Sequence, residues 1–118
     1  MNRRSFIFFA ILFSTGLFGC SEKLATNNDF QAVCAYFQEL EKLEDVDALT
    51  AEQRNNFIVV RIKKNISDSA ASISWEAVSY AAPEQRYEIF KMGAESALNE
   101  TWNCPAMEKL APLTGAVE

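Results

Sequence analysis

The sequence predicts an all-α fold, a small helical bundle of four to five helices closed by one disulfide bond. Apolar residues recur at intervals of three and four positions through most of residues 29–111, which is the spacing of a helix with one buried side. No segment shows the alternation of apolar and polar residues that is typical of a strand. Cys34 and Cys104 stand near the two ends of this region, where a disulfide bond would enclose most of it.

The first predicted helix covers residues 30–43. Asp29 suits its N-cap, because a carboxylate accepts hydrogen bonds from the free N–H groups of a first helical turn. The large apolar side chains of the segment fall on one face of a helix: Phe30, Val33, Phe37 and Leu40.

The second helix is predicted to begin at residue 51. Thr50 and Gln53 have the capping-box pattern, in which each side chain bonds to the backbone N–H of the other residue. No glycine or proline follows before Pro83. The buried stripe of this helix is expected to consist of Ile58, Ile62 and Ile66.

We expect a break near residues 68–72. Serine and aspartate side chains gather on both sides of this point, and they compete with the helix for backbone hydrogen bonds. A third helix then carries Trp75, Val78 and Ala82.

Pro83 fits the first turn of a fourth helix, where its missing N–H costs nothing and the charge of Glu84 is favourable. Pro105 in turn opens a short fifth helix that ends at Leu110, and residues 112–118 are predicted to form a frayed tail. The inward stripe of the fourth helix is expected to be Tyr87, Phe90, Ala94, Ala97 and Thr101, widened by Ile89, Leu98 and Trp102.

Residues 1–19 have the pattern of a secretory signal peptide. Arg3 and Arg4 precede an unbroken apolar run over residues 6–13. With the apolar residues that follow, the stretch reaches about a dozen positions, whereas a membrane-spanning helix needs about 20. We therefore expect a cleaved signal and not a transmembrane anchor.

The sequence Leu17-Phe18-Gly19-Cys20 resembles the lipobox of bacterial lipoproteins. That resemblance implies a diacylglycerol on Cys20, cleavage before this residue, and acylation of the freed amine. Several acyl chains, each methylene contributing about 0.8 kcal/mol, would hold the protein at a membrane permanently. Ser21 resembles the residue of lipoproteins sent to the outer membrane, and residues 20–28 would form the tether. The alternative is an ordinary cleaved signal with a chance cysteine at its end.

With Cys20 assigned to lipid, Cys34 and Cys104 are the only thiols left, and an oxidising compartment would join them. Such a bond closes a loop of about 70 residues, for which chain entropy gives roughly 4 kcal/mol of stabilisation. A redox or metal pair is the alternative, but the two residues lack the short spacing of such motifs.

Charge and composition narrow the classes of function. The chain has 11 basic and 16 acidic side chains, and removal of residues 1–19 takes away Arg3 and Arg4, which leaves nine basic residues against 16 acidic ones, a net charge of −7. This balance disfavours nucleic acid and anionic lipid as partners. The chain contains no histidine, the usual general base at neutral pH and the commonest zinc ligand, so no catalytic residue, cofactor or metal is predicted.

Arg54, Phe57, Arg61 and Lys64 share one face of the second predicted helix, and they form a candidate docking patch for an acidic partner or an anionic envelope polymer. The competing interpretation is that these cations pair with acidic residues at the end of the first helix and that Phe57 packs inside the domain. A similar choice applies to an aromatic set that would line either a ligand groove or the core: Trp75, Tyr80, Tyr87, Phe90 and Trp102.

We therefore expect a non-enzymatic lipoprotein anchored through Cys20, on the periplasmic side of the outer membrane. Its helical module would interact with another envelope component, a protein partner above all. A small chaperone-like or ligand-binding protein of the periplasm is the alternative, because acid-stress chaperones are similarly small, helical and closed by one disulfide bond. No motif for acyl transfer, phosphate binding or paired-carboxylate catalysis supports an enzyme.

Overall fold

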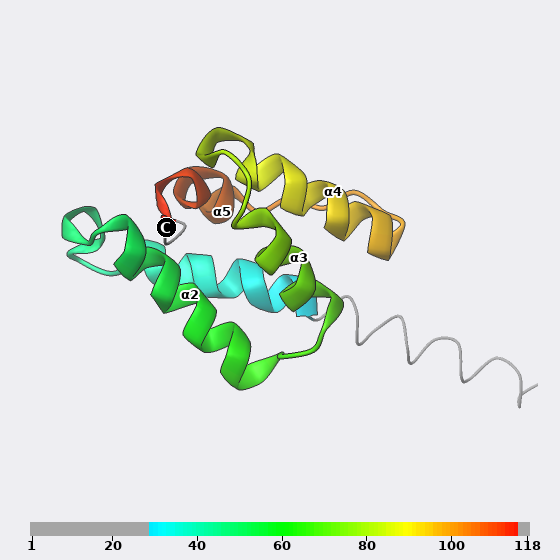
Figure 1. Cartoon of the computed structure of the whole chain (residues 1–118), viewed down its shortest axis with the longest axis horizontal. Helices are drawn as coiled ribbons and strands as arrows, with labels where there is room; N and C mark the ends of the chain where they lie inside the picture. The colour runs from blue at the N-terminus through cyan, green and yellow to red at the C-terminus, as the bar shows by residue number, and fades with distance from the viewer. Residues whose placement is uncertain (1–28, 116–118) are drawn as a thin grey trace, which may run out of the picture.

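The computed structural model describes residues 29–115, and within this range the chain is all-α (Figure 1). The predicted signal peptide, Cys20 and the tether lie outside the described residues, as do residues 116–118. Three short 3-10 turns accompany the helices: η1 (Val46–Ala48), η2 (Pro83–Gln85) and η3 (Ala111–Leu113). The five α-helices between residues 29 and 115 are the segment 29–41, called here the N-terminal helix, and α2 (Ala51–Asn65), α3 (Ala70–Val78), α4 (Arg86–Leu98) and α5 (Pro105–Leu110).

The N-terminal helix forms the centre of the core and crosses behind α2 in Figure 1. It is already helical at Asp29, so the prediction that this residue is the N-cap is wrong, and it ends at Glu41, two residues before the predicted limit. Its predicted stripe is confirmed, because all four members are fully buried: Phe30, Val33, Phe37 and Leu40.

The predicted start of α2 is confirmed in detail. The Thr50 hydroxyl accepts from the backbone N–H of Gln53 at 3.0 Å, and the Gln53 carboxamide oxygen accepts from the N–H of Thr50 at 2.8 Å. The helix buries Ile58 and Ile62, while Ile66 is its C-cap and packs partly against the core.

The break between α2 and α3 lies slightly earlier than predicted. Asp68 takes a left-handed conformation with φ of 71°, which reverses the chain. The Ser69 hydroxyl then caps α3 by accepting from the N–H of Ser72 at 3.0 Å. Trp75 and Val78 are buried as expected, but α3 ends at Val78 and Ala82 is exposed beyond it.

α3 and α4 run antiparallel and pack closely (Figure 1). A Cβ atom on Gly93 of α4 would lie only 3.2 Å from the hydroxyl oxygen of Ser74 on α3, so a glycine allows the two helices to approach at this point. Pro83 opens the 3-10 turn η2, and the α-helical hydrogen bonding begins only at Arg86.

The predicted stripe of α4 is correct in its first half and wrong in its second. Tyr87, Phe90 and Ala94 are buried. Ala97 is exposed in the last turn of the helix. Asn99 ends the helix in a left-handed conformation with φ of 58°, so Thr101 lies outside it and is also exposed. Of the predicted flanking residues, Trp102 is buried, Leu98 packs partly against the core, and Ile89 is 38% exposed.

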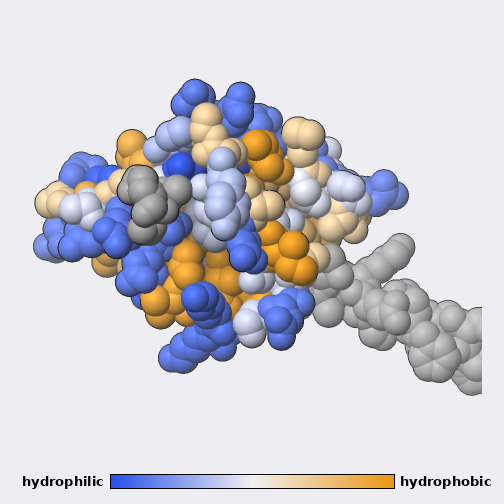
Figure 2. Space-filling model, viewed as in Figure 1, coloured by the Kyte–Doolittle hydropathy of each residue, from blue (hydrophilic) through white to orange (hydrophobic). Residues whose placement is uncertain are grey.

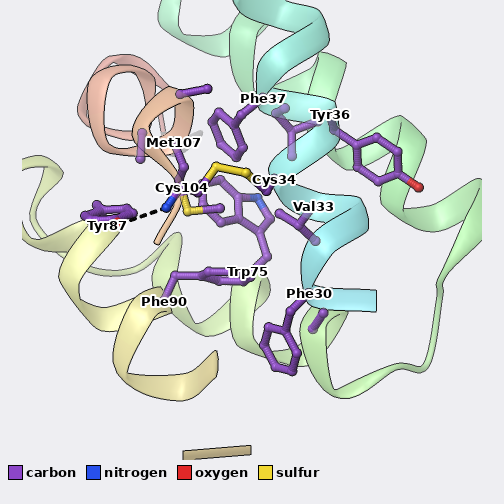
Figure 3. Close-up of a cluster of buried hydrophobic side chains, with 14 of the residues drawn as sticks. Phe30, Val33, Cys34, Tyr36, Phe37, Trp75, Tyr87, Phe90, Cys104 and Met107 are labelled. Carbon is purple, nitrogen blue, oxygen red and sulfur yellow. Dashed lines mark hydrogen bonds between the residues drawn. A yellow bond between two sulfur atoms is a disulfide. The ribbon is translucent and has the colours of Figure 1, made fainter. Parts of the chain in front are cut away.

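Aromatic rings fill the middle of the core (Figure 3). The ring centroid of Trp75 lies 5.3 Å from that of Phe37 and 6.1 Å from that of Phe90, both in edge-on contacts. Trp102 packs 5.4 Å from Phe90 on the other side. The core interpretation of the predicted aromatic set is therefore confirmed for four members, and Tyr80 is the exception because it is 86% exposed.

The predicted disulfide bond is confirmed. Cys34 on the N-terminal helix is bonded to Cys104, directly before α5, and the two Cα atoms are 5.8 Å apart (Figure 3). The short helix α5 has the predicted bounds. The predicted tail differs from the structure up to Gly115: Thr114 is buried, and the N–H of Gly115 donates to the carbonyl of Ala51 at 2.8 Å.

Candidate interaction surfaces

Arg54, the first member of the predicted basic patch, forms hydrogen bonds within the domain. Its guanidinium donates to the carbonyls of Val46 at 3.1 Å, Asp47 at 3.3 Å and Leu113 at 3.1 Å. Arg54 thereby joins the loop before α2 to the turn η3 near the end of the described chain. These contacts account for the residue without any partner.

Arg61 and Phe57 form the middle of the patch and are in contact. The guanidinium carbon of Arg61 lies 3.5 Å from the ring centroid of Phe57, and its Nε donates to the Glu39 carboxylate at 3.0 Å. Phe57 is half-buried against the core, while Lys64 is exposed and forms no ion pair within residues 29–115. The expected pairing across the helical hairpin is thus present for Arg61.

A second surface is the groove between α2 and α3, with a volume of about 270 Å³. Trp75 is the one member of the predicted aromatic set that contacts it, and the indole Nε1 of this residue is buried with no hydrogen-bond partner within residues 29–115. The residues around the groove are Asn55, Val59, Ile62 and Lys63 of α2 and Ser72, Trp75, Glu76 and Ser79 of α3 and its end.

The third surface, called here the α3–α4 face, was not predicted from the sequence. Tyr80, Met92 and Ile73 expose 86%, 64% and 62% of their surface. In Figure 2 orange and tan side chains lie among white and blue ones over the region of α3 and α4, and a broader orange area lies lower in the view, towards α2. The face consists of Ile73, Ala77 and Tyr80 from α3 and the turn after it, and of Ile89, Met92 and the small Ser96 from α4.

Helix geometry places five of these six side chains together, and Tyr80 lies in the turn that follows α3. Ile73 and Ala77 are one turn apart on α3, and Ile89, Met92 and Ser96 follow a three-to-four residue spacing on α4. The close approach of Ser74 and Gly93 aligns the two rows side by side. The only sequence signal for the face is that Ile73 and Met92 fall outside the buried stripes of their helices.

Exposed carboxylates border the α3–α4 face. Glu76 lies three residues after Ile73, and Glu88 lies four residues before Met92, so one flanks each helix. Glu84 and Glu100 stand before and after α4, near its two ends. None of these four carboxylates forms an ion pair with another residue between 29 and 115.

The two cations on α3 and α4, Arg86 and Lys91, are both paired within the fold, and Lys63 of α2 lies beside Glu76 in the groove between α2 and α3. Arg86 is buried, and its guanidinium donates to the carbonyls of Ala81 and Thr114. The Lys91 ammonium donates to Glu95, which also accepts from the backbone N–H of Trp102 at 3.0 Å. The hydrogen bond from Lys91, followed by that from Trp102, lowers the pKa of the Glu95 carboxyl from its ordinary value. The border of the α3–α4 face is therefore acidic.

Comparisons with known proteins return no relative: no family model, no curated protein and no solved structure matches the chain. In the part of the chain from 29 to 115, no three histidine, cysteine or acidic side chains are arranged to hold a metal ion. Across the same residues, no helix has both the length and the hydropathy needed to span a bilayer.

Proposed function

We propose that this chain is a non-enzymatic lipoprotein of a bacterial envelope, whose helical module binds another envelope component through the α3–α4 face. The observation that carries the proposal is that the three most exposed large apolar side chains among residues 29–115, those of Tyr80, Met92 and Ile73, all lie on α3, on α4 or in the turn after α3. Contiguous apolar patches on small proteins are characteristic of binding surfaces.

The proposed anchor is Cys20, on the basis of the lipobox-like sequence from Leu17 to Cys20. Eight residues separate it from Asp29, and even a fully extended chain of this length reaches at most about 29 Å. The partner must then lie at the same membrane or within a few nanometres of it. Ser21 favours the outer membrane, with the domain in the periplasm.

We favour binding over catalysis because the large exposed side chains of the α3–α4 face and its border are apolar residues or carboxylates without an ion pair within residues 29–115. The described residues bring together no nucleophile with a base, and the buried polar groups serve the fold: Arg86 holds Thr114, and Tyr87 holds Cys104. Arg86 and Tyr87 therefore stabilise the helical domain that carries the α3–α4 face.

A second candidate function is the binding of a small ligand in the groove between α2 and α3. The observation that favours it is the buried indole N–H of Trp75, which has no acceptor within residues 29–115. A buried donor left unpaired costs about 1–3 kcal/mol. Because this N–H is covered by the fold, a ligand with a carbonyl or carboxylate oxygen would pair with it only if its entry shifts the side chains around Trp75. Such a ligand should raise the melting temperature of the protein and change its tryptophan fluorescence.

The anchor is tested by expression of the full-length chain in a bacterial host with a clickable palmitate analogue. We expect label on the wild-type protein, which fractionates with membranes, and none on the Cys20→Ala variant. Wild-type protein that is secreted without label would overturn the anchor and leave the binding surface untouched.

The binding surface is tested by a photo-crosslinking amino acid placed at Met92 in living cells. The matched control is the same substitution at Val60, an apolar residue on α2 that is 50% exposed and lies outside the α3–α4 face. We expect one discrete crosslinked species from position 92 and none from position 60. Equal crosslinking from both positions would contradict a specific interface.

A further inference from the structure

We infer that the partner presents an amphipathic α-helix, with apolar side chains along one side and lysine or arginine residues beside them, and that this helix lies along the seam between α3 and α4. The inference rests on the proposed function and specifies its partner. Three properties of the α3–α4 face lead to it: its backbone offers no pairing groups outside the helix ends, its centre has small side chains among larger apolar ones, and its border is acidic.

The first property is the backbone. Both sides of the face are helices, which pair their N–H and C=O groups internally except in the first and last turns. An extended peptide laid on such a surface would bury its own backbone groups without partners, which is costly. A helix satisfies these groups internally, so a helical segment is the form of chain that this face can accept.

The second property is the shape of the centre. Near the closest approach of the two helices the residues are small, with Ala77 on α3 and Gly93 and Ser96 on α4, and the larger apolar residues around them are Ile73, Ile89 and Met92. Small residues permit a third helix to approach two packed helices closely, and the larger side chains then pack along its flanks. α4 has 13 residues and is therefore about 20 Å long, which matches three to four turns of a partner helix.

The third property is the negative charge of the border, which distinguishes between the partners that could bind the α3–α4 face. A second copy of this chain would bring Glu76, Glu84, Glu88 and Glu100 against the same four residues, and like charges across an interface are unfavourable. The headgroups of anionic lipids would be repelled for the same reason. A helix with basic residues beside its apolar stripe meets these unpaired carboxylates with opposite charge.

The test uses three synthetic peptides of 15 residues. The first has leucine at helical spacing with lysine beside the leucines and alanine elsewhere; the second replaces every lysine with glutamate; the third has the composition of the first in scrambled order. The protein is the full chain purified from a bacterial envelope, held in phosphatidylcholine nanodiscs if it is lipidated and free in buffer if it is not. Binding is measured by fluorescence anisotropy, with empty nanodiscs as background.

We expect the lysine peptide to bind at least tenfold more tightly than either of the others. The double variant I73S/M92S should lose at least tenfold in affinity, whereas V60S, the matched exposed position on α2, should retain it. The double variant E76Q/E88Q should bind more weakly, with a smaller dependence on salt than the wild type. All the altered side chains are exposed, and an unchanged melting temperature confirms that the variants fold.

Three outcomes would overturn the inference. Equal binding of the lysine and glutamate peptides would remove the role of the acidic border. Dimerisation of the protein in sedimentation experiments, abolished by I73S/M92S, would assign the face to a second copy. Stronger association with neutral vesicles than with the lysine peptide, lost in the same variant, would assign it to lipid. These results are independent of lipid labelling at Cys20, so failure of the anchor and failure of the helix partner are distinguishable.

Discussion

The phenolic oxygen of Tyr87 on α4 accepts a hydrogen bond from the backbone N–H of Cys104 at 3.0 Å, and both residues are buried (Figure 3). Cys104 is therefore held in place by a hydrogen bond to Tyr87 on α4 as well as by its disulfide bond to Cys34. The Tyr87→Phe substitution would leave the Cys104 N–H buried without an acceptor. We expect it to lower the free energy of unfolding by about 1–3 kcal/mol, measured by urea denaturation. Tyr80→Phe, at an exposed position, is the control and should have no effect.

Removal of the disulfide bond should cost more than any single hydrogen bond. The bond joins residues 70 positions apart, and bonds of this kind typically contribute about 2–4 kcal/mol. The double variant C34A/C104A should therefore melt at a clearly lower temperature than the wild type in calorimetry. Dithiothreitol should lower the melting temperature of the wild type and leave that of the double variant unchanged. A wild type equally stable in reducing buffer would contradict a structural role for the bond.

Arg54 and Lys64, which the sequence groups in one basic patch, should differ sharply in their effect on stability. Arg54 donates to three carbonyls of the surrounding loops, whereas Lys64 is exposed and unpaired within residues 29–115. We expect Arg54→Met to lower the free energy of unfolding by about 1–2 kcal/mol. Lys64→Met should change it by less than about 0.5 kcal/mol. Similar effects of the two substitutions in denaturant titrations would refute the assignment of Arg54 to the fold.

Glu95 should make part of the free energy of unfolding depend on pH in the acidic range. Its hydrogen bonds from Lys91 and Trp102 lower the pKa of its carboxyl in the folded protein. The unfolded chain therefore binds this proton first as the pH falls. The corresponding stabilisation is complete above the ordinary glutamate pKa and is lost as the pH falls through the lowered value.

The Glu95→Gln variant tests this dependence. Its free energy of unfolding should fall less steeply with acid than that of the wild type in the range just below the ordinary glutamate pKa, measured by urea denaturation at a series of pH values. The control is Ser96→Ala, an exposed position on the same helix without a titratable side chain, whose acid profile should follow that of the wild type. Parallel profiles for Glu95→Gln and the wild type would show that the pair contributes nothing.

Local signals in the sequence predicted the fold well. The capping box of Thr50 and Gln53 and the helix-opening Pro105 act within three or four residues, and both elements begin where these signals place them. The pairing of Cys34 with Cys104 followed from the small number of cysteines and is confirmed. The stripes of α3 and α4 were wrong at Ala82 and Thr101, because the helices end before these residues, and at Ala97, which is exposed in the last turn of α4.

The surfaces were harder to predict, because their character depends on residues distant in the chain. Arg54 was grouped with a docking patch, but one of its acceptors, the carbonyl of Leu113, lies 59 positions away. Ile89 was expected to widen a buried stripe, yet it lies in an exposed apolar face. Periodicity shows that an apolar side chain lies on a given side of a helix, but not whether another element covers that side.

The disulfide bond makes a covalent ring of the chain from Cys34 to Cys104, and this ring contains α2, α3 and α4 with the turns between them. A protease that cuts once inside the ring, for example at the exposed turn around Asp68 or in the segment after Asn99, opens the backbone but separates nothing. The piece before the cut still contains the N-terminal helix and any anchor that precedes it, and the piece after the cut stays joined to it through the bond between Cys104 and Cys34. Release of the α3–α4 face by one proteolytic cut within the ring therefore requires a reductant as well, and without one a nicked molecule keeps its interaction surface attached to the N-terminal side of the chain.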